Sequence, residues 1–192
     1  LSGLRNLSIR THNVHWPTLN LEVDGNTFQY TKNLVRLDLS TNNIWSLPEG
    51  IFCTLSNLKV LNISGNRLHE INELAFRERS GAENHEPSMA PPLSGSIGKK
   101  PIPPPTISTP TSTSSSSLLA SLSDKKFITC ASDMELLDIS FNYFVILPEN
   151  GFGILKRLRV LKLNNNEISM LADKALGGLR NLLTIDLSSN KI

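Results

Sequence analysis

The chain has 192 residues, 39% of them hydrophobic, and a formal net charge of +2. This length suits one compact domain or a short repeat array, and the balanced charge excludes the basic surface that binds nucleic-acid phosphates or an anionic membrane. No run approaches the roughly 18 to 20 apolar residues that cross a bilayer, and residues 1–10 lack the features of a signal peptide. We therefore expect any membrane segment to lie outside this sequence.

A sequence repeat of fixed period organises both ends of the chain. Its pattern is L-x-x-L-x-L-x-x-N-x-L, and the same interval separates Asn42 from Asn66, Asn142 from Asn166 and Asn166 from Asn190. Complete copies begin at Leu34, Leu58, Met134, Leu158 and Leu182, and a degenerate copy begins at Leu4. The alternating L-x-L predicts a short strand with one face inward, which a single repeat cannot bury without stacked neighbours.

The repeats predict an α/β fold class, a curved leucine-rich-repeat solenoid with a short parallel β-sheet on its concave face. We expect each asparagine to lie where the chain turns away from the strand, with its amide bonded to buried backbone groups of adjoining coils. Large apolar residues that follow an asparagine by ten positions should fill the return side of each coil. These are Phe52, Phe76, Phe152 and Leu176.

Residues 1–77 are predicted to form the first set of repeats. Within them, the interval from His12 to Asn42 is longer than one period. This excess predicts a loop around Trp16 and Pro17.

Residues 78–129 interrupt one repeat, because the interval from Asn66 to Asn142 equals one period plus the length of this segment. Eight of the 11 prolines lie between Pro87 and Pro110, and ten of the twelve residues at 106–117 are serine or threonine. Such a segment cannot bury a core, so we predict a disordered insertion. A tolerated loop is the simplest interpretation, beside an O-glycosylated spacer or a polyproline ligand at 101–105.

Residues 130–192 are predicted to continue the same solenoid, and they hold one of the two cysteines. Cys53 follows Asn42 by eleven positions. The position one period before Asn142 is equivalent to a repeat asparagine, and Cys130 follows that position by twelve. The two cysteines therefore fall on adjacent coils at nearly the same angular position, which permits a disulfide. We predict this bond and expect it to close the coil where the insertion opens it.

Sequence motifs for catalysis or metal binding are missing. The chain has no H-E-x-x-H, C-x-x-C or G-x-S-x-G motif, and Gly98-Lys99 does not complete a phosphate loop. We therefore predict a protein that is not an enzyme, with no metal and no cofactor.

Two sequons point outside the cell. Asn6-Leu7-Ser8 and Asn62-Ile63-Ser64 each match N-x-[ST], the acceptor of N-glycans in secreted proteins. Both asparagines occupy outward strand positions, so a glycan at either would cover part of the concave face.

Exposed strand positions of the concave face form a predicted strip for binding a partner protein. Apolar side chains there are of the kind that anchors interfaces. The strip includes Arg36, Asp38, Leu136, Asp138, Phe141, Val160, Lys162, Asn164 and Asp186.

The second half of the repeat contains L-P-x-x-x-F at residues 47–52 and 147–152, which resembles animal extracellular leucine-rich repeats. At closer range, LDLSTNNIWSLPEGIFCTLSNLKVLNISGNRL and LPENGFGILKRLRVLKLNNNEISMLADKALGGLRNLLTIDLSSNKI look like the long insect Toll receptors. The insertion departs from that family's pattern.

This resemblance implies a single-span receptor on the extracellular side of the plasma membrane. Its ectodomain would bind a cystine-knot cytokine of the Spätzle type or another surface receptor, and its cytoplasmic TIR domain would signal by dimerising. Two alternatives stay open at this point, an adhesion or matrix leucine-rich-repeat protein without a signalling domain and a cytosolic scaffold with reduced cysteines.

Overall fold

The computed structural model describes residues 1–11, 21–70, 73–79 and 127–192. Contacts divide the chain into two units, and the unit described below comprises Leu1–Glu78 and Phe127–Ile192. The other unit, Arg79–Lys126, lies almost entirely outside the described residues. The predicted loop around Trp16 and Pro17 also lies outside them. Across the described ranges, no helix has the length and apolar character needed to cross a membrane.

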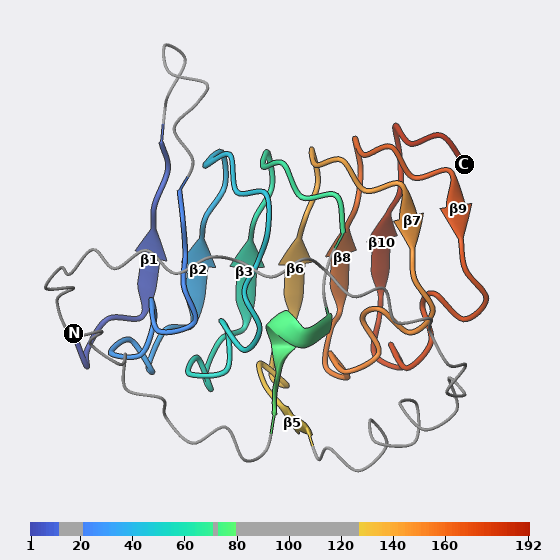
Figure 1. Ribbon diagram of the computed structural model, residues 1–192. Coiled ribbons are helices and arrows are strands. Elements are labelled where there is room, and N and C mark those ends of the chain that lie inside the picture. The colour runs from blue at the N-terminus through green and yellow to red at the C-terminus, as the bar shows by residue number, and fades with distance from the viewer. Residues whose placement is uncertain (12–20, 71–72, 80–126) are drawn as a thin grey trace, which may run out of the picture. The chain divides into compact units, whose positions relative to one another are not determined.

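Six three-residue strands form one parallel sheet, in the order β1-β2-β3-β6-β8-β10 (Figure 1). The strands are β1 (Asn6–Ser8), β2 (Arg36–Asp38), β3 (Val60–Asn62), β6 (Leu136–Asp138), β8 (Val160–Lys162) and β10 (Thr184–Asp186). Each strand belongs to one copy of the repeat, and every residue pairs with the equivalent residue of the next copy. The predicted solenoid of stacked coils is confirmed.

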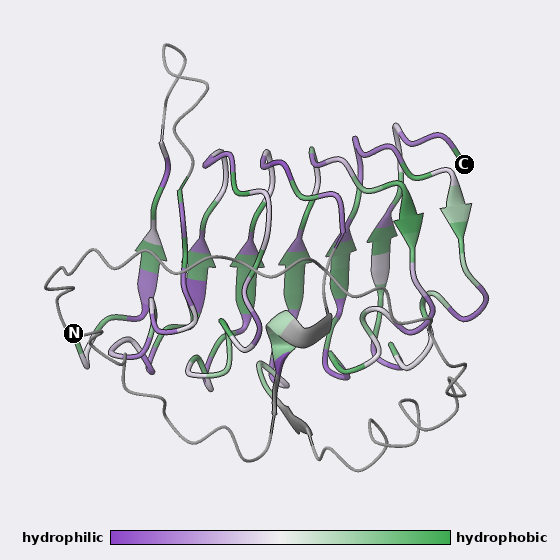
Figure 2. Cartoon of the chain, viewed as in Figure 1, coloured by the Kyte–Doolittle hydropathy of each residue, from purple (hydrophilic) through white to green (hydrophobic). Residues whose placement is uncertain are grey.

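The core is built from the residues that the repeat pattern keeps apolar. The middle residue of each inner strand is fully buried, as Leu61 and Leu137 show with exposed fractions of 0%. Figure 2 shows this hydrophobic band running through the strands. On the return side, Phe52 and Phe76 are buried with ring centroids 5.2 Å apart, whereas Leu176 on the last coil is 36% exposed.

A ladder of buried asparagine amides holds the coils together. The Asn66 Oδ1 atom accepts hydrogen bonds from the backbone N–H groups of Asn42 and Ile44, both at 3.0 Å. Its Nδ2 atom donates to the carbonyl oxygens of Leu39 at 3.0 Å and Ile63 at 2.9 Å. One side chain thus satisfies backbone groups of two coils, as the repeat pattern predicts.

The return side consists mainly of turns. In the described part of the chain the only helix is the 3-10 helix η1 (Glu73–Phe76), and a small parallel pair joins β7 (Ile146–Leu147) to β9 (Met170–Leu171). A repeat as short as this one leaves little length for an α-helix once the strand and the two turns are built. The helical layer of the α/β class is therefore reduced to turns and one short helix.

The structure describes the two ends of the predicted insertion of 78–129. Residues 78–79 belong to β4 (Arg77–Arg79), and residues 127–129 form β5 (Phe127–Thr129), which pairs with β4. The stretch between these strands, 80–126, lies outside the described residues. The main sheet continues directly across this point, because β3 pairs with β6.

Candidate protein-binding surface

The outward residues of the six strands form two parallel rows, which we call the sheet face. The first row comprises Asn6, Arg36, Val60, Leu136, Val160 and Thr184, and the second comprises Ser8, Asp38, Asn62, Asp138, Lys162 and Asp186. Seven of the nine residues of the predicted strip lie in these rows. The other two, Phe141 and Asn164, follow strands β6 and β8 within three positions.

The structure divides the predicted strip into two groups. Arg36 and Asp38 lie on β2, and strand β3 with Val60 and Asn62 separates them from the rest. The other seven residues lie on β6, β8 and β10 or directly after them, and we call them the C-terminal patch. The patch comprises Leu136, Asp138, Phe141, Val160, Lys162, Asn164 and Asp186.

Phe141 is the most exposed large apolar side chain of the C-terminal patch. Its exposed fraction is 57%, and its φ angle is +54°. The equivalent residues Thr41, Gly65, Asn165 and Ser189 also have positive φ, so the repeat imposes this left-handed turn. A bulky residue adopts that conformation at a cost that glycine or asparagine avoids. Core packing does not compensate this cost, because the ring is exposed.

The aspartates of the sheet face have a structural task that sequence analysis missed. The Asp138 Oδ1 atom accepts hydrogen bonds from the Ser140 backbone N–H at 3.2 Å and the Ser140 hydroxyl at 2.6 Å. Asp186 accepts the same pair of bonds from Ser188 at 3.0 and 2.7 Å. These bonds close the turn that follows each strand. The recurring D/N-x-S spacing was the signal that could have revealed them.

Hydrogen bonds and nearby cations hold the pKa of two sheet-face carboxylates, Asp38 and Asp186, below the ordinary value. Burial opposes ionisation of Asp38, but hydrogen bonds from Arg10 and Ser40 outweigh it and hold its pKa below the ordinary value. The Ser188 hydroxyl and backbone N–H likewise lower the pKa of Asp186. Within the C-terminal patch, the Lys162 ammonium lies 3.3 Å from Asp138. The patch therefore combines apolar side chains with acidic and basic ones.

The two sequons lie on the sheet face but in different settings. Asn6 is exposed on β1, at one edge of the sheet. Asn62 is half-buried on β3, where its Oδ1 atom accepts a hydrogen bond of 3.0 Å from the Ser64 backbone N–H. Asn6 is therefore distant in strand order from the C-terminal patch, whereas Asn62 is the neighbour of Asp138 in that patch.

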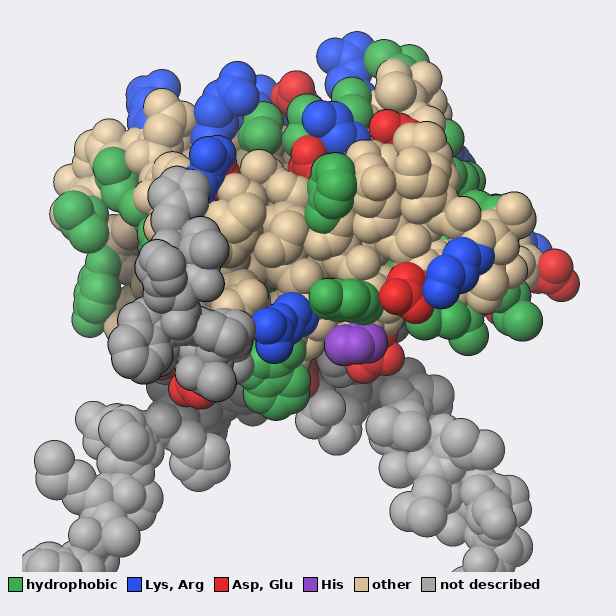
Figure 3. Space-filling model, turned by 90° about the horizontal axis from the view of Figure 1, so that it is seen from above, with side chains coloured by type: hydrophobic (Ala, Val, Ile, Leu, Met, Phe, Trp, Pro, Cys, Tyr) green, Lys and Arg blue, Asp and Glu red, His purple; other side chains and the backbone are tan. Residues whose placement is uncertain are grey.

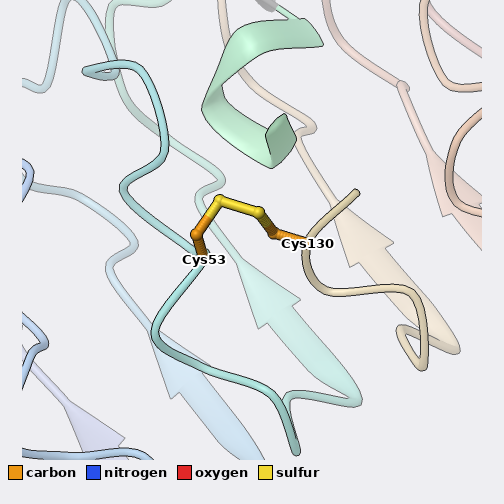
Figure 4. Close-up of a disulfide and its surroundings, with 2 residues drawn as sticks. All are labelled: Cys53 and Cys130. Atoms are coloured by element: carbon orange, nitrogen blue, oxygen red, sulfur yellow. A yellow bond between two sulfur atoms is a disulfide. The ribbon is translucent and has the colours of Figure 1, made fainter. Parts of the chain in front are cut away.

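A disulfide joins Cys53 and Cys130, with their Cα atoms 4.6 Å apart (Figure 4). The bond links the coil before the predicted insertion to the segment that follows it, across a sequence separation of 77. The Cys130 backbone N–H also donates a hydrogen bond of 2.8 Å to the Phe76 carbonyl oxygen. Adjacent coils thus meet at the predicted position.

A family model of the leucine rich repeat matches residues 22–79 and 132–192. The chain belongs to the leucine-rich repeat family. This assignment agrees with the register of the strands and with the asparagine ladder described above. It covers both sides of the predicted insertion.

Two receptors carry similar leucine-rich repeats. Toll-like receptor 7 of Drosophila melanogaster is 29% identical over 184 residues, which cover 95% of this chain and 10% of that protein. Toll-like receptor 3 of Boselaphus tragocamelus is 30% identical over 208 residues, which cover 99% of this chain and 22% of that protein. The chain therefore spans a small part of each relative. These matches confirm the resemblance to Toll receptors that the sequence indicates.

A solved structure of the Toll–Spatzle complex from Drosophila shows the same fold. Its TM-score is 0.59 at 18% sequence identity, and the match covers 91% of this chain and 16% of that chain. Its leucine-rich repeats therefore stack as those of this chain do.

This leucine-rich repeat chain has a second ladder of asparagines, which sequence analysis missed. The Nδ2 atoms of Asn33 and Asn181 donate to the carbonyl oxygens of Ser2 at 2.6 Å and Lys156 at 2.7 Å, each on the preceding coil. Two intermediate repeats replace the amide by an ion pair of 2.8 Å between Asp133 and Arg157. The recurring Asn-Leu dipeptide at the start of the repeat was the available signal.

Across the described ranges, no group of three or more histidine, cysteine, aspartate or glutamate side chains is placed to hold a metal ion. The strands present outward side chains at the fixed spacing of the repeat. Such a surface suits contact with another macromolecule.

Proposed function

We propose that this chain is the extracellular ligand-binding part of a Toll-type transmembrane signalling receptor, and that its C-terminal patch binds a protein ligand. The observation that carries the proposal is Phe141. Its aromatic ring is exposed directly after β6, beside the sheet face, at a backbone angle that disfavours bulky residues. The repeat imposes this angle on Thr41, Gly65, Asn165 and Ser189 as well, and Phe141 is the aromatic residue among these equivalents.

The surroundings of Phe141 resemble the anatomy of a protein interface. Leu136 and Val160 are neighbours across strands β6 and β8 and are half-buried, so they add apolar area in the first row of the sheet face. Asp138, Lys162 and Asp186 add polar side chains in the second row. Protein interfaces combine a few aromatic or apolar anchors with polar neighbours in this way.

The proposed ligand is a cystine-knot cytokine of the Spätzle type, and the second candidate partner is another surface receptor, including a second copy of this one. Two observations support a protein ligand. The relatives are Toll-like receptors, and the solved structure with the same fold is a complex of Toll with Spatzle. The complete receptor would carry its membrane span and TIR domain outside these residues.

An N-glycan at Asn6 would cover the β1 edge of the sheet face. An N-glycan at Asn62 would lie next to the C-terminal patch, because Asn62 pairs with Asp138 across strands β3 and β6. Strands β6, β8 and β10 themselves carry no N-x-[ST] sequon. The proposed patch is therefore open to a protein ligand where Asn62 is not glycosylated.

The test is the affinity of the secreted chain for mature Spatzle cytokine, measured by surface plasmon resonance. We expect Phe141→Ala and Lys162→Glu each to weaken binding about tenfold or more, since anchor residues contribute upward of about 1 kcal/mol. The matched controls are Tyr30→Ala, which removes an aromatic ring that is 76% exposed away from the sheet face, and Lys156→Glu. Equal effects of the patch and control variants would contradict the proposal, as would a complete lack of binding by the unmodified chain.

A further inference from the structure

Beside the sheet face, the segments that follow the asparagine turns form a flank of the solenoid with several exposed aromatic side chains. Trp45 is 63% exposed, three positions after the buried Asn42. His69 occupies the equivalent position of the next coil and stacks on Tyr143, with ring centroids 5.4 Å apart. Figure 3 shows a hydrophobic side chain beside the histidine of this flank, with basic and acidic side chains next to them. The Trp45 ring does not fill the core, because the preceding residue, Ile44, is the buried one on this coil.

Two surface hollows meet at Trp45, and each contains one carboxylate. The first has a volume of about 310 Å³ and is lined by Trp45, Ser46, Leu47, His69 and Glu70. The second has a volume of about 260 Å³ and is lined by Leu21, Glu22, Val23, Trp45 and Ser46. The indole thus stands between two acidic side chains.

The carboxylates that line these hollows, those of Glu22 and Glu70, are both acidic. Lysine and arginine are absent from both sets of lining residues. Glu22 and Glu70 are exposed, and among the residues that the structure describes neither forms an ion pair. Arg67 lies on the same flank but lines neither hollow and already has a partner.

We propose that this flank, centred on Trp45, binds an arginine or lysine side chain of a protein partner. The face of an indole attracts a cation through its quadrupole, and a nearby carboxylate adds charge pairing. Phosphate and nucleic acid are repelled by the same carboxylates. This contact is a second surface, separate from the C-terminal patch, and it does not rest on the ligand proposed for that patch.

The probe is a capped peptide, Gly-Arg-Ser-Arg-Gly, titrated into the isotope-labelled chain while the tryptophan indole N–H signals are followed by NMR. The control peptide carries citrulline in place of both arginines, which keeps the shape and removes the charge. Trp16→Phe assigns the two indole signals. We expect a saturating shift of the Trp45 signal with the arginine peptide and an affinity at least about tenfold weaker for the citrulline peptide.

The variants separate the roles of the ring and the carboxylates. Trp45→Ala, followed through the His69 and Glu70 amide signals, and the double variant Glu22→Gln with Glu70→Gln should each weaken the arginine peptide about three- to tenfold. Tyr30→Ala and Phe141→Ala should leave its affinity unchanged, so a failed C-terminal patch does not affect the outcome. Equal affinities of the two peptides, or an unchanged affinity in Trp45→Ala, would overturn the inference. Because Trp45, Glu22, Glu70, Tyr30 and Phe141 are exposed, preserved amide spectra are expected for the variants at these positions.

Discussion

At the scale of single residues, each buried asparagine stabilises the fold through several hydrogen bonds to backbone groups. The Asn166 Nδ2 atom donates to the Ile139 and Leu163 carbonyl oxygens at 3.2 and 2.8 Å, and its Oδ1 atom accepts from the Phe144 N–H at 3.2 Å. Removing the amide leaves these backbone groups buried without partners. Water cannot replace it, because Asn166 is only 7% exposed.

We therefore predict that Asn166→Ala lowers the free energy of unfolding by about 1 to 3 kcal/mol, and that Asn42→Ala does the same. Asn181→Ala is the control, since Asn181 donates one bond of 2.7 Å at an exposed position where water can take its place. Its cost should stay within about 0.5 kcal/mol. Urea denaturation of the three variants measures the difference, and equal costs would show that burial of the amide does not matter.

Asp38 gives a prediction for acid pH. Its pKa in the folded chain is lower than in the unfolded chain, so the carboxylate stabilises the fold above the unfolded pKa of about 3.9. That stabilisation is lost as the pH falls through the folded pKa. Asp38→Asn keeps the turn, as Asn62 does with Ser64 at 3.0 Å, and removes the charge.

The melting temperatures of wild-type chain and Asp38→Asn should therefore differ at pH 7 and converge at pH 2. Differential scanning calorimetry at the two pH values measures this. Hydrogen bonds from Ser40 to Asp38 persist with the amide, so the remaining difference reports the pairing with Arg10. A difference that is the same at both pH values would show that the charge of Asp38 contributes nothing.

At the scale of elements, the strands and the main asparagine ladder were predictable from sequence because one residue type recurs at a fixed spacing. Leu37 and Leu61 lie side by side in the sheet as the period of the repeat requires. Pairing of β4 with β5 was not predictable from sequence. The residues of these strands, Arg77–Arg79 and Phe127–Thr129, do not belong to a pattern that recurs in the other repeats. Their pairing arises only because the coil closes there.

The position of the candidate site on the sheet was predictable from sequence, but the division of its residues into two groups was not. Alternation along each strand identifies the outward residues, and all nine lie on or beside the sheet face. The structure divides these nine residues into two groups, with strand β3 between them. Sequence alone does not show this division, because β3 and β6 are neighbours in the sheet but distant in the sequence. The positive φ of Phe141 was also hidden, because the equivalent positions hold Thr41, Gly65 and Asn165 without a common residue type.

The disulfide is the element that holds the two sets of repeats together at the insertion. With a sequence separation of 77, it should stabilise the chain by about 4 kcal/mol on loop-entropy grounds. We predict that peptide mapping of secreted material under non-reducing conditions finds Cys53 linked to Cys130. The double variant Cys53→Ala with Cys130→Ala should unfold at a lower urea concentration.

Free thiols would contradict the predicted disulfide. If both cysteines of the secreted protein can be alkylated without reduction, the cytosolic scaffold is favoured, because disulfides persist in oxidising compartments. A double variant as stable as the wild type would show that the hydrogen bond from Cys130 to Phe76 and the β3–β6 pairing suffice to close the coil.

At the scale of the whole molecule, the repeats on either side of the insertion form one unit. The backbone N–H groups of Ile63 and Gly65 donate to the carbonyl oxygens of Asp138 and Ser140 at 2.8 and 3.0 Å. Lys59 and Glu135 form an ion pair of 2.9 Å at the same junction. These contacts connect the two sides without any residue of 80–126.

We predict that replacing residues 80–126 by a short Gly-Ser linker preserves the fold, because β4 and β5 already bring the two ends together. The melting temperature should stay within a few degrees, since shortening a loop changes its closure entropy only slightly. The reference is the melting temperature of the wild-type chain. A drop of ten degrees or more would show that 80–126 packs against the repeats.

The central claim is that the sheet face around Phe141 is where a protein ligand binds. A photo-reactive benzoyl-phenylalanine placed at position 141, and in a second chain at position 30, tests it most directly. Illumination in the presence of mature Spatzle cytokine, followed by mass spectrometry, should yield a cross-linked complex from position 141 and none from position 30. A cross-link from position 30 alone, in a chain that still binds the cytokine, would contradict the claim.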